Sequence, residues 1–299
     1  MDYVGKRGWF LLASFIIIIP GIIFLIISPG LKPGIDFTGG STFTLKFAGP
    51  ITQSTLRQEL SNIGHSDSTV QKIDKDTYFI RTKQLDNKNA LLSSSNSVLN
   101  SDIVQVLSFD LVSPVVAFET VRNAFIALVF ASIGIFLYLW WAFRNVPSPF
   151  RYGAAAVVAL IHDSMVVIGI FAILGNLYDV EVNTMFLIGL LTVIGYSVND
   201  TIVVFDRIRE NMLMYPNRSL ILNANLSISE SLGRSLNTSL TLLFTLFALL
   251  LFGGPTIQVF LWVLLIGVVV GTFSSIGIAT NLLVIWESGD IKRILRINN

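Results

Sequence analysis

Titratable residues interrupt three of the long apolar runs in this sequence, and they are the first candidates for chemistry. The pair His162-Asp163 lies about eleven residues into one run, a depth of roughly 16 Å along a helix. The pair Asn199-Asp200 lies in the next run, and Arg234 lies early in the run after that. Ionisable groups are expensive in hydrocarbon and usually serve a function there. A proton pathway is the chemistry that this set of residues fits.

Asp200 and Arg234 belong to consecutive runs joined by one basic loop, so their helices are expected to be antiparallel neighbours. If the first helix leaves the membrane near Asp206 and the second enters near Ser229, each residue sits about one and a half turns inside. At this matched depth the carboxylate and the guanidinium could pair. A carboxylate whose proton affinity depends on its distance from an arginine is what a proton relay needs.

Two structural alternatives stay open. Asp200 and Arg234 could form a static ion pair that only satisfies two buried charges, and the Arg234 side chain could extend to the membrane surface. Asp163 could simply be held by His162 and by hydrogen bonds between helices.

The sequence lacks the common motifs for a bound nucleotide or metal. It contains no GxxxxGK[ST] loop and no HExxH pair. It also contains no cysteine, which excludes disulfides, thiolate metal sites and a cysteine nucleophile. We therefore expect no catalytic residue, no cofactor and no metal. If the protein performs work, the energy must come from a source other than ATP bound to this chain.

The elements that must position these residues are membrane-spanning helices. Only 13% of the 299 residues are charged and 53% are hydrophobic, whereas a soluble domain carries about 25% charged residues. The net charge of +1 gives no reason to expect nucleic acid as a partner. A bilayer core requires about 20 apolar residues per helix. Runs of this kind lie near 9–27, 122–142, 152–175, 183–205, 232–252 and 257–286.

The first run is expected to be a retained helix, because no small-residue cleavage site follows it. Basic residues in short loops set the orientation of such a chain. They precede the first run, separate the second from the third and the fourth from the fifth, and follow the sixth. The alternate short loops, 176–181 and 253–256, contain none. The expectation is a multi-pass membrane protein with both termini in the cytoplasm.

The polar stretch 31–118 is expected to be a soluble extracytoplasmic domain, set between a first part (1–30) and a five-helix bundle (119–299). Strands are predicted at 41–47, 70–73, 77–82 and 103–112, and helices at 52–63 and 86–99. This order, βαββαβ, is the ferredoxin-like pattern. The fold class is therefore an α-helical polytopic membrane protein of six helices with an inserted ferredoxin-like α+β domain.

The segment GIDFTGG leads into this domain and contains Gly34, Asp36, Gly39 and Gly40. It lacks the preceding strand and following helix of a dinucleotide site. It is either a plain turn-rich connection or a hinge for the domain.

Six short motifs lie along the chain: GIDFTGG (34–40), ALIHD (159–163), IGYSVNDTIVVFDRIREN (194–211), SLNTSLTLL (235–243), FGG (252–254) and GTFSSI (271–276). They resemble those of the SecD/SecF family, in the resistance-nodulation-division superfamily. The similarity covers nearly the whole chain, and the Asn-Asp pair favours the SecF branch. Two departures are the small outer domain and Phe205, where a small residue is common.

The resemblance implies a subunit that binds SecD, works beside the SecYEG channel with YajC as a further partner, and uses the proton gradient to pull preproteins outward. It places the family's proton-pathway residues on Asp200 and Arg234. Two alternatives are an exporter half-unit for small molecules or lipids, and a purely structural subunit of the translocase.

Overall fold

The computed structural model describes residues 2–27, 30–49, 51–62, 64–66, 68–82 and 103–288. The chain divides into two compact units, one formed by residues 1–32 and 126–299 and the other by residues 33–125. The described part contains six helices that are long and apolar enough to cross a membrane. The chain is therefore a multi-pass helical membrane protein.

Each of the six helices overlaps one of the predicted apolar runs. They are α1 (Arg7–Ile26), α6 (Pro114–Ala142), α7 (Pro149–Tyr178), α8 (Thr184–Met214), α9 (Leu220–Phe252) and a last helix of three segments. The three segments are α10 (Gln258–Ser274), the π-helical η2 (Ser275–Ala279) and α11 (Thr280–Glu287), preceded by the 3-10 turn η1 (Pro255–Ile257). Two-residue strands, β1 (Lys32–Pro33) and β6 (Glu181–Val182), follow α1 and α7.

The α8–α9 hairpin is longer than its apolar runs. Both helices continue past the expected membrane boundary near Asp206 and Ser229, and only residues 215–219 separate them. The Ser219 side chain accepts a hydrogen bond from the Leu222 amide and so caps the start of α9. Hydropathy predicts only the apolar part of a helix. Polar residues extend both helices beyond that part, so the apolar runs underestimate their length.

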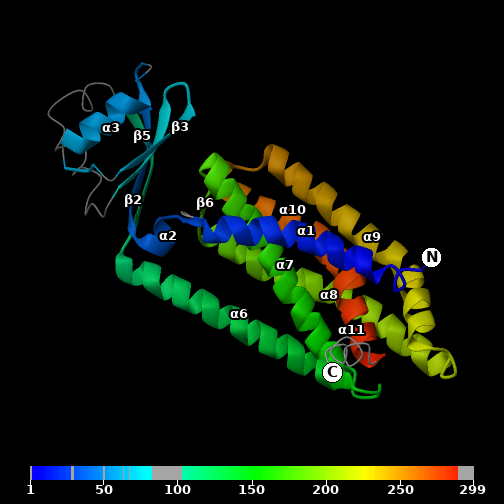
Figure 1. Cartoon of the computed structure of the whole chain (residues 1–299). Coiled ribbons are helices and arrows are strands. Elements are labelled where there is room, and N and C mark those ends of the chain that lie inside the picture. Colours follow the sequence, from blue (N-terminus) through cyan, green and yellow to red (C-terminus); the bar gives the residue numbers. More distant parts are fainter. Residues whose placement is uncertain are drawn as a thin grey trace. The chain divides into compact units, whose positions relative to one another are not determined.

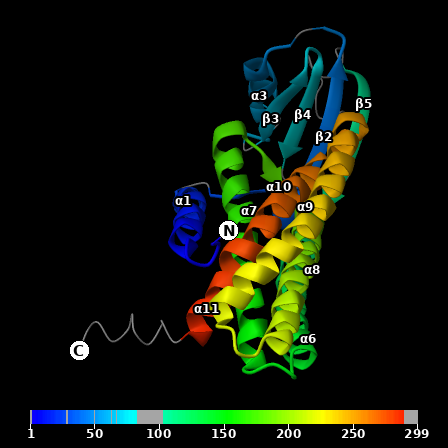
Figure 2. The same ribbon diagram turned by 90° about the vertical axis from the view of Figure 1, so that its right-hand side faces the viewer.

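The bundle is organised around α8, which packs against α7, α9 and α10. Figure 2 shows α8, α9 and α10 side by side. Helix α1 crosses α7 (Figure 1) at Gly21 and Gly169, where a Cβ on either residue would lie 2.7 Å from the Cα of the other. Small residues let membrane helices approach this closely. The close crossing brings α1 into the group of helices around the titratable residues.

The smaller unit contains a four-stranded antiparallel sheet in the order β3-β4-β2-β5. Its elements are β2 (Gly40–Phe47), α3 (Gln53–Asn62), β3 (Thr69–Asp74), β4 (Thr77–Thr82) and β5 (Ile103–Val112). Leu56 and Leu60 of α3 are buried in one cluster with the inward-facing side chains of β2, β3 and β4, among them Phe43 and Tyr78. Alternate strand residues and one helix face therefore bury the core, as the sequence pattern predicts.

The predicted second helix of this domain, 86–99, lies outside the described residues, as does Ile63. The ferredoxin-like fold therefore stays a prediction here.

The GIDFTGG segment forms one helical turn, α2 (Ile35–Thr38), which contains Asp36 and begins after Gly34. Gly39 and Gly40 follow with φ values of +71° and +131°. L-residues with side chains rarely adopt this backbone region. A Cβ at Gly40 would also lie 2.7 Å from the carbonyl oxygen of Thr82. The double glycine is therefore required for the tight connection from α2 into β2.

Candidate functional site

Asp200 lies on α8 inside the bundle, and only 6% of the residue is exposed. Its carboxylate accepts a hydrogen bond from the Ser235 hydroxyl of α9 at 2.5 Å and another from the Ser275 hydroxyl of η2 at 2.8 Å. Ser235 donates to Oδ1 and Ser275 donates to Oδ2. The Asp200 carboxylate thus connects three helical segments, and both of these partners are neutral donors.

Arg234 precedes Ser235 on α9 and is exposed. It lines a cavity of about 150 Å³ together with Asp200, Asn199 and Tyr196. Asp200 and Arg234, which the sequence predicts at matched depth, therefore line the same cavity. Within the described residues, however, no direct ion pair joins Arg234 to Asp200. The hydroxyls of Ser235 and Ser275, which lie in two of the quoted motifs but were not predicted as partners of Asp200, donate to the carboxylate instead.

Asp163 lies on α7 and is almost fully buried, with 1% exposed. It accepts hydrogen bonds from Ser274 at 2.7 Å and from Ser197 of α8, and its other oxygen lies 2.8 Å from Nδ1 of His162. The second ring nitrogen of His162, Nε2, lies 2.6 Å from the Ser14 hydroxyl of α1. With Asp163 ionised, Nδ1–H donates to the carboxylate and Nε2 accepts from Ser14. This cluster joins α1, α7, α8 and α10.

Consecutive serines link the two carboxylates, because Ser274 contacts Asp163 and Ser275 contacts Asp200. Both serines are fully buried at the junction of α10 and η2. The Thr280 hydroxyl donates to the Ser275 carbonyl at 2.9 Å, five residues back, within this π-helical turn. Single π turns inside helices occur often at functional sites. Ser-Ser inside an apolar run is the signal by which the sequence could have revealed this link.

Within the described residues, no group of three His, Cys, Asp or Glu side chains could hold a metal ion. The carboxylates and hydroxyls are suited to holding and releasing a proton, since each oxygen can change between donor and acceptor roles.

Comparison with known proteins gives the family. Residues 93–289 match the family described as "Protein export membrane protein SecD/SecF, C-terminal", and residues 24–51 match the "SecD/SecF GG Motif". The chain belongs to the SecD/SecF family. Both carboxylates and Arg234 lie in the first matched region, and the GIDFTGG segment lies in the second.

Relatives in the SecD/SecF family share the whole length of the chain. The protein translocase subunit SecF of Thermobaculum terrenum is 42% identical, over 99% of this chain and 97% of the relative. The subunit of the same name from Anaerolinea thermophila is 41% identical, over 97% of this chain and 95% of the relative. These values support the SecF branch that the Asn-Asp pair indicates.

Solved structures of SecDF have the same fold over nearly all of this chain. SecDF of Thermus thermophilus, described as a translocon-associated membrane protein, gives a TM-score of 0.81 at 28% identity, covering 96% of this chain. SecDF in its super-membrane-facing form gives a TM-score of 0.69 at 29% identity, covering 99% of this chain. The chain spans 39% and 40% of the length of these two SecDF chains.

Proposed function

We propose that this chain is an accessory, non-enzymatic subunit of the Sec preprotein translocase. It acts with SecD beside the SecYEG channel, with YajC as a further partner, and uses the proton gradient to promote export of preproteins. Membership of the SecD/SecF family and full-length similarity to SecF subunits support the translocase part of this proposal. The buried carboxylate of Asp200, beside Arg234 on one cavity, is the observation that carries the proton part.

Protonation of Asp200 would change its hydrogen bonds in a defined way. The Ser275 hydroxyl lies 2.8 Å from the Asp200 carboxylate and 3.0 Å from the Thr272 carbonyl oxygen. A serine has one hydroxyl hydrogen, so it donates to one of these acceptors at a time. When Asp200 is ionised, Ser275 donates to it. When Asp200 is protonated, its O–H donates to Ser275, which then donates to Thr272.

Asp163 can undergo the same exchange through Ser274, whose hydroxyl lies 2.7 Å from the carboxylate and 3.2 Å from the Gly271 carbonyl oxygen. We include Asp163, His162 and Asn199 in the proton pathway with Asp200 and Arg234. His162 would transmit the state of Asp163 to α1 through Ser14. Because both exchanges act on the same turn of the last helix, proton binding becomes coupled to helix geometry.

The proposed architecture has both termini in the cytoplasm, the bundle in the bacterial inner membrane, and residues 31–118 outside as a ferredoxin-like domain. The described sheet, with one helix packed on it, supports this fold. Gly34, Asp36, Gly39 and Gly40 would form the hinge between the first helix and this domain. An exporter role is less well supported, since the cavities beside Arg234 hold about 150 and 260 Å³, below the usual size of roughly 300–1,000 Å³ for ligand sites.

The test is export of a preprotein into inverted membrane vesicles, with and without a proton gradient, by complexes that contain Asp200→Asn. The variant should keep export at the level without a gradient and lose the stimulation by the gradient. Assembly with SecD, measured by co-purification, should be unchanged. Full stimulation in Asp200→Asn would refute the assignment of Asp200, and the complete absence of SecD from the purified complex would refute the partner.

A further inference from the structure

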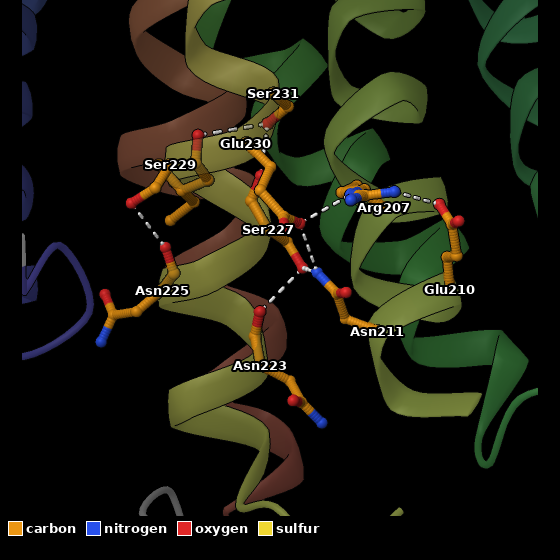
Figure 3. A network of polar contacts seen from close by, with 10 residues as sticks. Arg207, Glu210, Asn211, Asn223, Asn225, Ser227, Ser229, Glu230 and Ser231 are labelled. Carbon is orange, nitrogen blue, oxygen red and sulfur yellow. Dashed lines mark hydrogen bonds and ion pairs between the residues drawn. The ribbon is translucent and has the colours of Figure 1, made fainter. Parts of the chain in front are cut away.

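Polar side chains continue along the contact between α8 and α9, from Asp200 to the loop that joins the two helices. Near the loop, Asn211 of α8 donates to Ser227 of α9 at 2.9 Å. One turn further in, Nε of Arg207 donates to Oε2 of Glu230 at 2.6 Å, an arrangement visible in Figure 3. The Asp200–Ser235 hydrogen bond follows about two turns further along α8. Only the inner end of this series takes part in the proton chemistry of Asp200 and Asp163.

Two cavities lie along the same contact. The cavity of about 150 Å³ contains Asp200, and a second one of about 260 Å³ lies nearer the loop. Val203 and Arg234 line both cavities, so the two adjoin. The second is also lined by Asp206, Arg207, Glu210, Glu230 and Ser231. Polar cavities of this size have room for water, which occupies about 30 Å³ per molecule in the liquid.

Arg207 lies between two carboxylates, as Figure 3 shows. It donates through Nε to Glu230 and through NH1 to Glu210, both at 2.6 Å. The side chains of Arg207 and Glu230 are 34% and 32% exposed. Such half-exposed pairs are weak, so they open and close readily. Asn211 also donates to Glu230 at 2.8 Å, which keeps its carboxylate at the cavity when Arg207 leaves.

We infer that Glu230 carries protons between the loop-side water and Asp200. Arg207 controls this transfer by forming and breaking its ion pair with Glu230. This inference rests on the proposed proton-driven function. With Arg207 bound to both carboxylates, Glu230 stays ionised. With Arg207 bound to Glu210 alone, Glu230 accepts a proton from protonated Asp200 through cavity water and releases it to the loop side when Arg207 returns. Asp200 and Glu230 are then both ionised again. Among the described residues, the other charged groups that line this cavity with Glu230, Arg207 and Glu210 are Asp206 and Arg234.

Thiol accessibility tests the water route without any measurement of export. The chain has no cysteine, and a thiol reacts quickly only where water supports its thiolate. Val203→Cys in the otherwise unchanged complex should react with a membrane-impermeant methanethiosulfonate applied from the side that labels Asn217→Cys. Adding Arg207→Gln should raise the rate about fivefold, the size expected for release of a weak ion pair. Val204→Cys is the matched control, because this neighbour is fully buried and should not react. No reaction at Val203→Cys would overturn the water route. A rate unchanged by Arg207→Gln would overturn the control by Arg207.

Glu230→Gln tests the proton carrier. Gradient-stimulated export should fall by at least about tenfold, because loss of one proton-transfer group typically costs about 100-fold or more. Glu230→Asp should restore most of the stimulation. Glu119→Gln, which removes an exposed carboxylate on α6, should export normally. If Asp200→Asn loses the stimulation but Glu230→Gln keeps it in full, this inference alone is overturned. Full stimulation in both variants would overturn the proposed function as well.

Discussion

Ser274 and Ser275 are consecutive residues whose hydroxyls donate to two different buried carboxylates, Asp163 at 2.7 Å and Asp200 at 2.8 Å. Consecutive residues on a helix point about 100° apart, since a turn contains 3.6 residues. The last helix therefore faces α7 with one hydroxyl and the α8–α9 pair with the other. A change in protonation at either carboxylate acts on the same peptide of the chain.

Ser275→Ala should remove one donor to Asp200 and leave the buried carboxylate partly unsatisfied. The loss of such a hydrogen bond costs about 1–3 kcal/mol, and we expect gradient-stimulated export to fall by at least about tenfold. Export with and without a proton gradient measures this. Ser132→Ala is the control, because the Ser132 hydroxyl donates to its own helix, at the Leu128 carbonyl. Equal stimulation in both variants would separate Ser275 from the mechanism.

Gly169→Ala should reduce the amount of folded protein, because its Cβ would lie 2.7 Å from the Cα of Gly21 on α1. Forcing two helices apart typically costs about 1–3 kcal/mol, and it would also lengthen the contact between His162 and Ser14. Gly134→Ala on α6 is the control, since within the described part of the chain no atom beyond the adjoining backbone of α6 lies within 4 Å of its Cβ position. Thermal unfolding in detergent measures both variants. A midpoint that is unchanged for Gly169→Ala would show that the α1–α7 crossing tolerates separation.

The sequence predicts the six helices and the positions of the four strands. Long apolar runs indicate helices within the membrane, and alternating residues indicate strands with one buried face. It also predicts that Asp200 and Arg234 approach one another, since two antiparallel helices joined by one loop have matched depths. It does not predict that serines hold Asp200, because hydroxyl partners on α9 and η2 depend on how the helices rotate. The π turn that follows Ser274 likewise has no signature in hydropathy.

Single cysteines placed at Ser54 and at Asn217 should label from opposite sides of the membrane. Both positions are exposed, and the chain has no other thiol. The basic short loops predict that Asn217 lies in the cytoplasm, and Ser54 lies in the domain proposed to be outside. Labelling of intact cells with an impermeant maleimide should therefore modify only Ser54→Cys. Modification of Asn217→Cys alone would reverse the proposed orientation, and modification of both would contradict the proposed topology.

Residues 36–113 expressed alone should fold as an α+β domain without disulfides. The buried cluster that contains Leu60 and Tyr78 supplies its core. Chains of this size often fold independently, although with a marginal core. Nuclear magnetic resonance chemical shifts should show a second helix within 86–99 if the domain is ferredoxin-like. Extended or random-coil shifts throughout 86–99 would contradict that fold.

Gradient-stimulated export by the double variant Asp200→Asn with Arg234→Gln tests the central claim most directly. A static ion pair would tolerate joint neutralisation, so the double variant would regain activity that each single variant had lost. A proton pathway needs a group that binds and releases a proton, and the amide introduced by Asp200→Asn cannot do so in either background. We therefore predict that both single variants and the double variant assemble normally but lose stimulation by the proton gradient. Recovery of wild-type stimulation in the double variant would contradict the account.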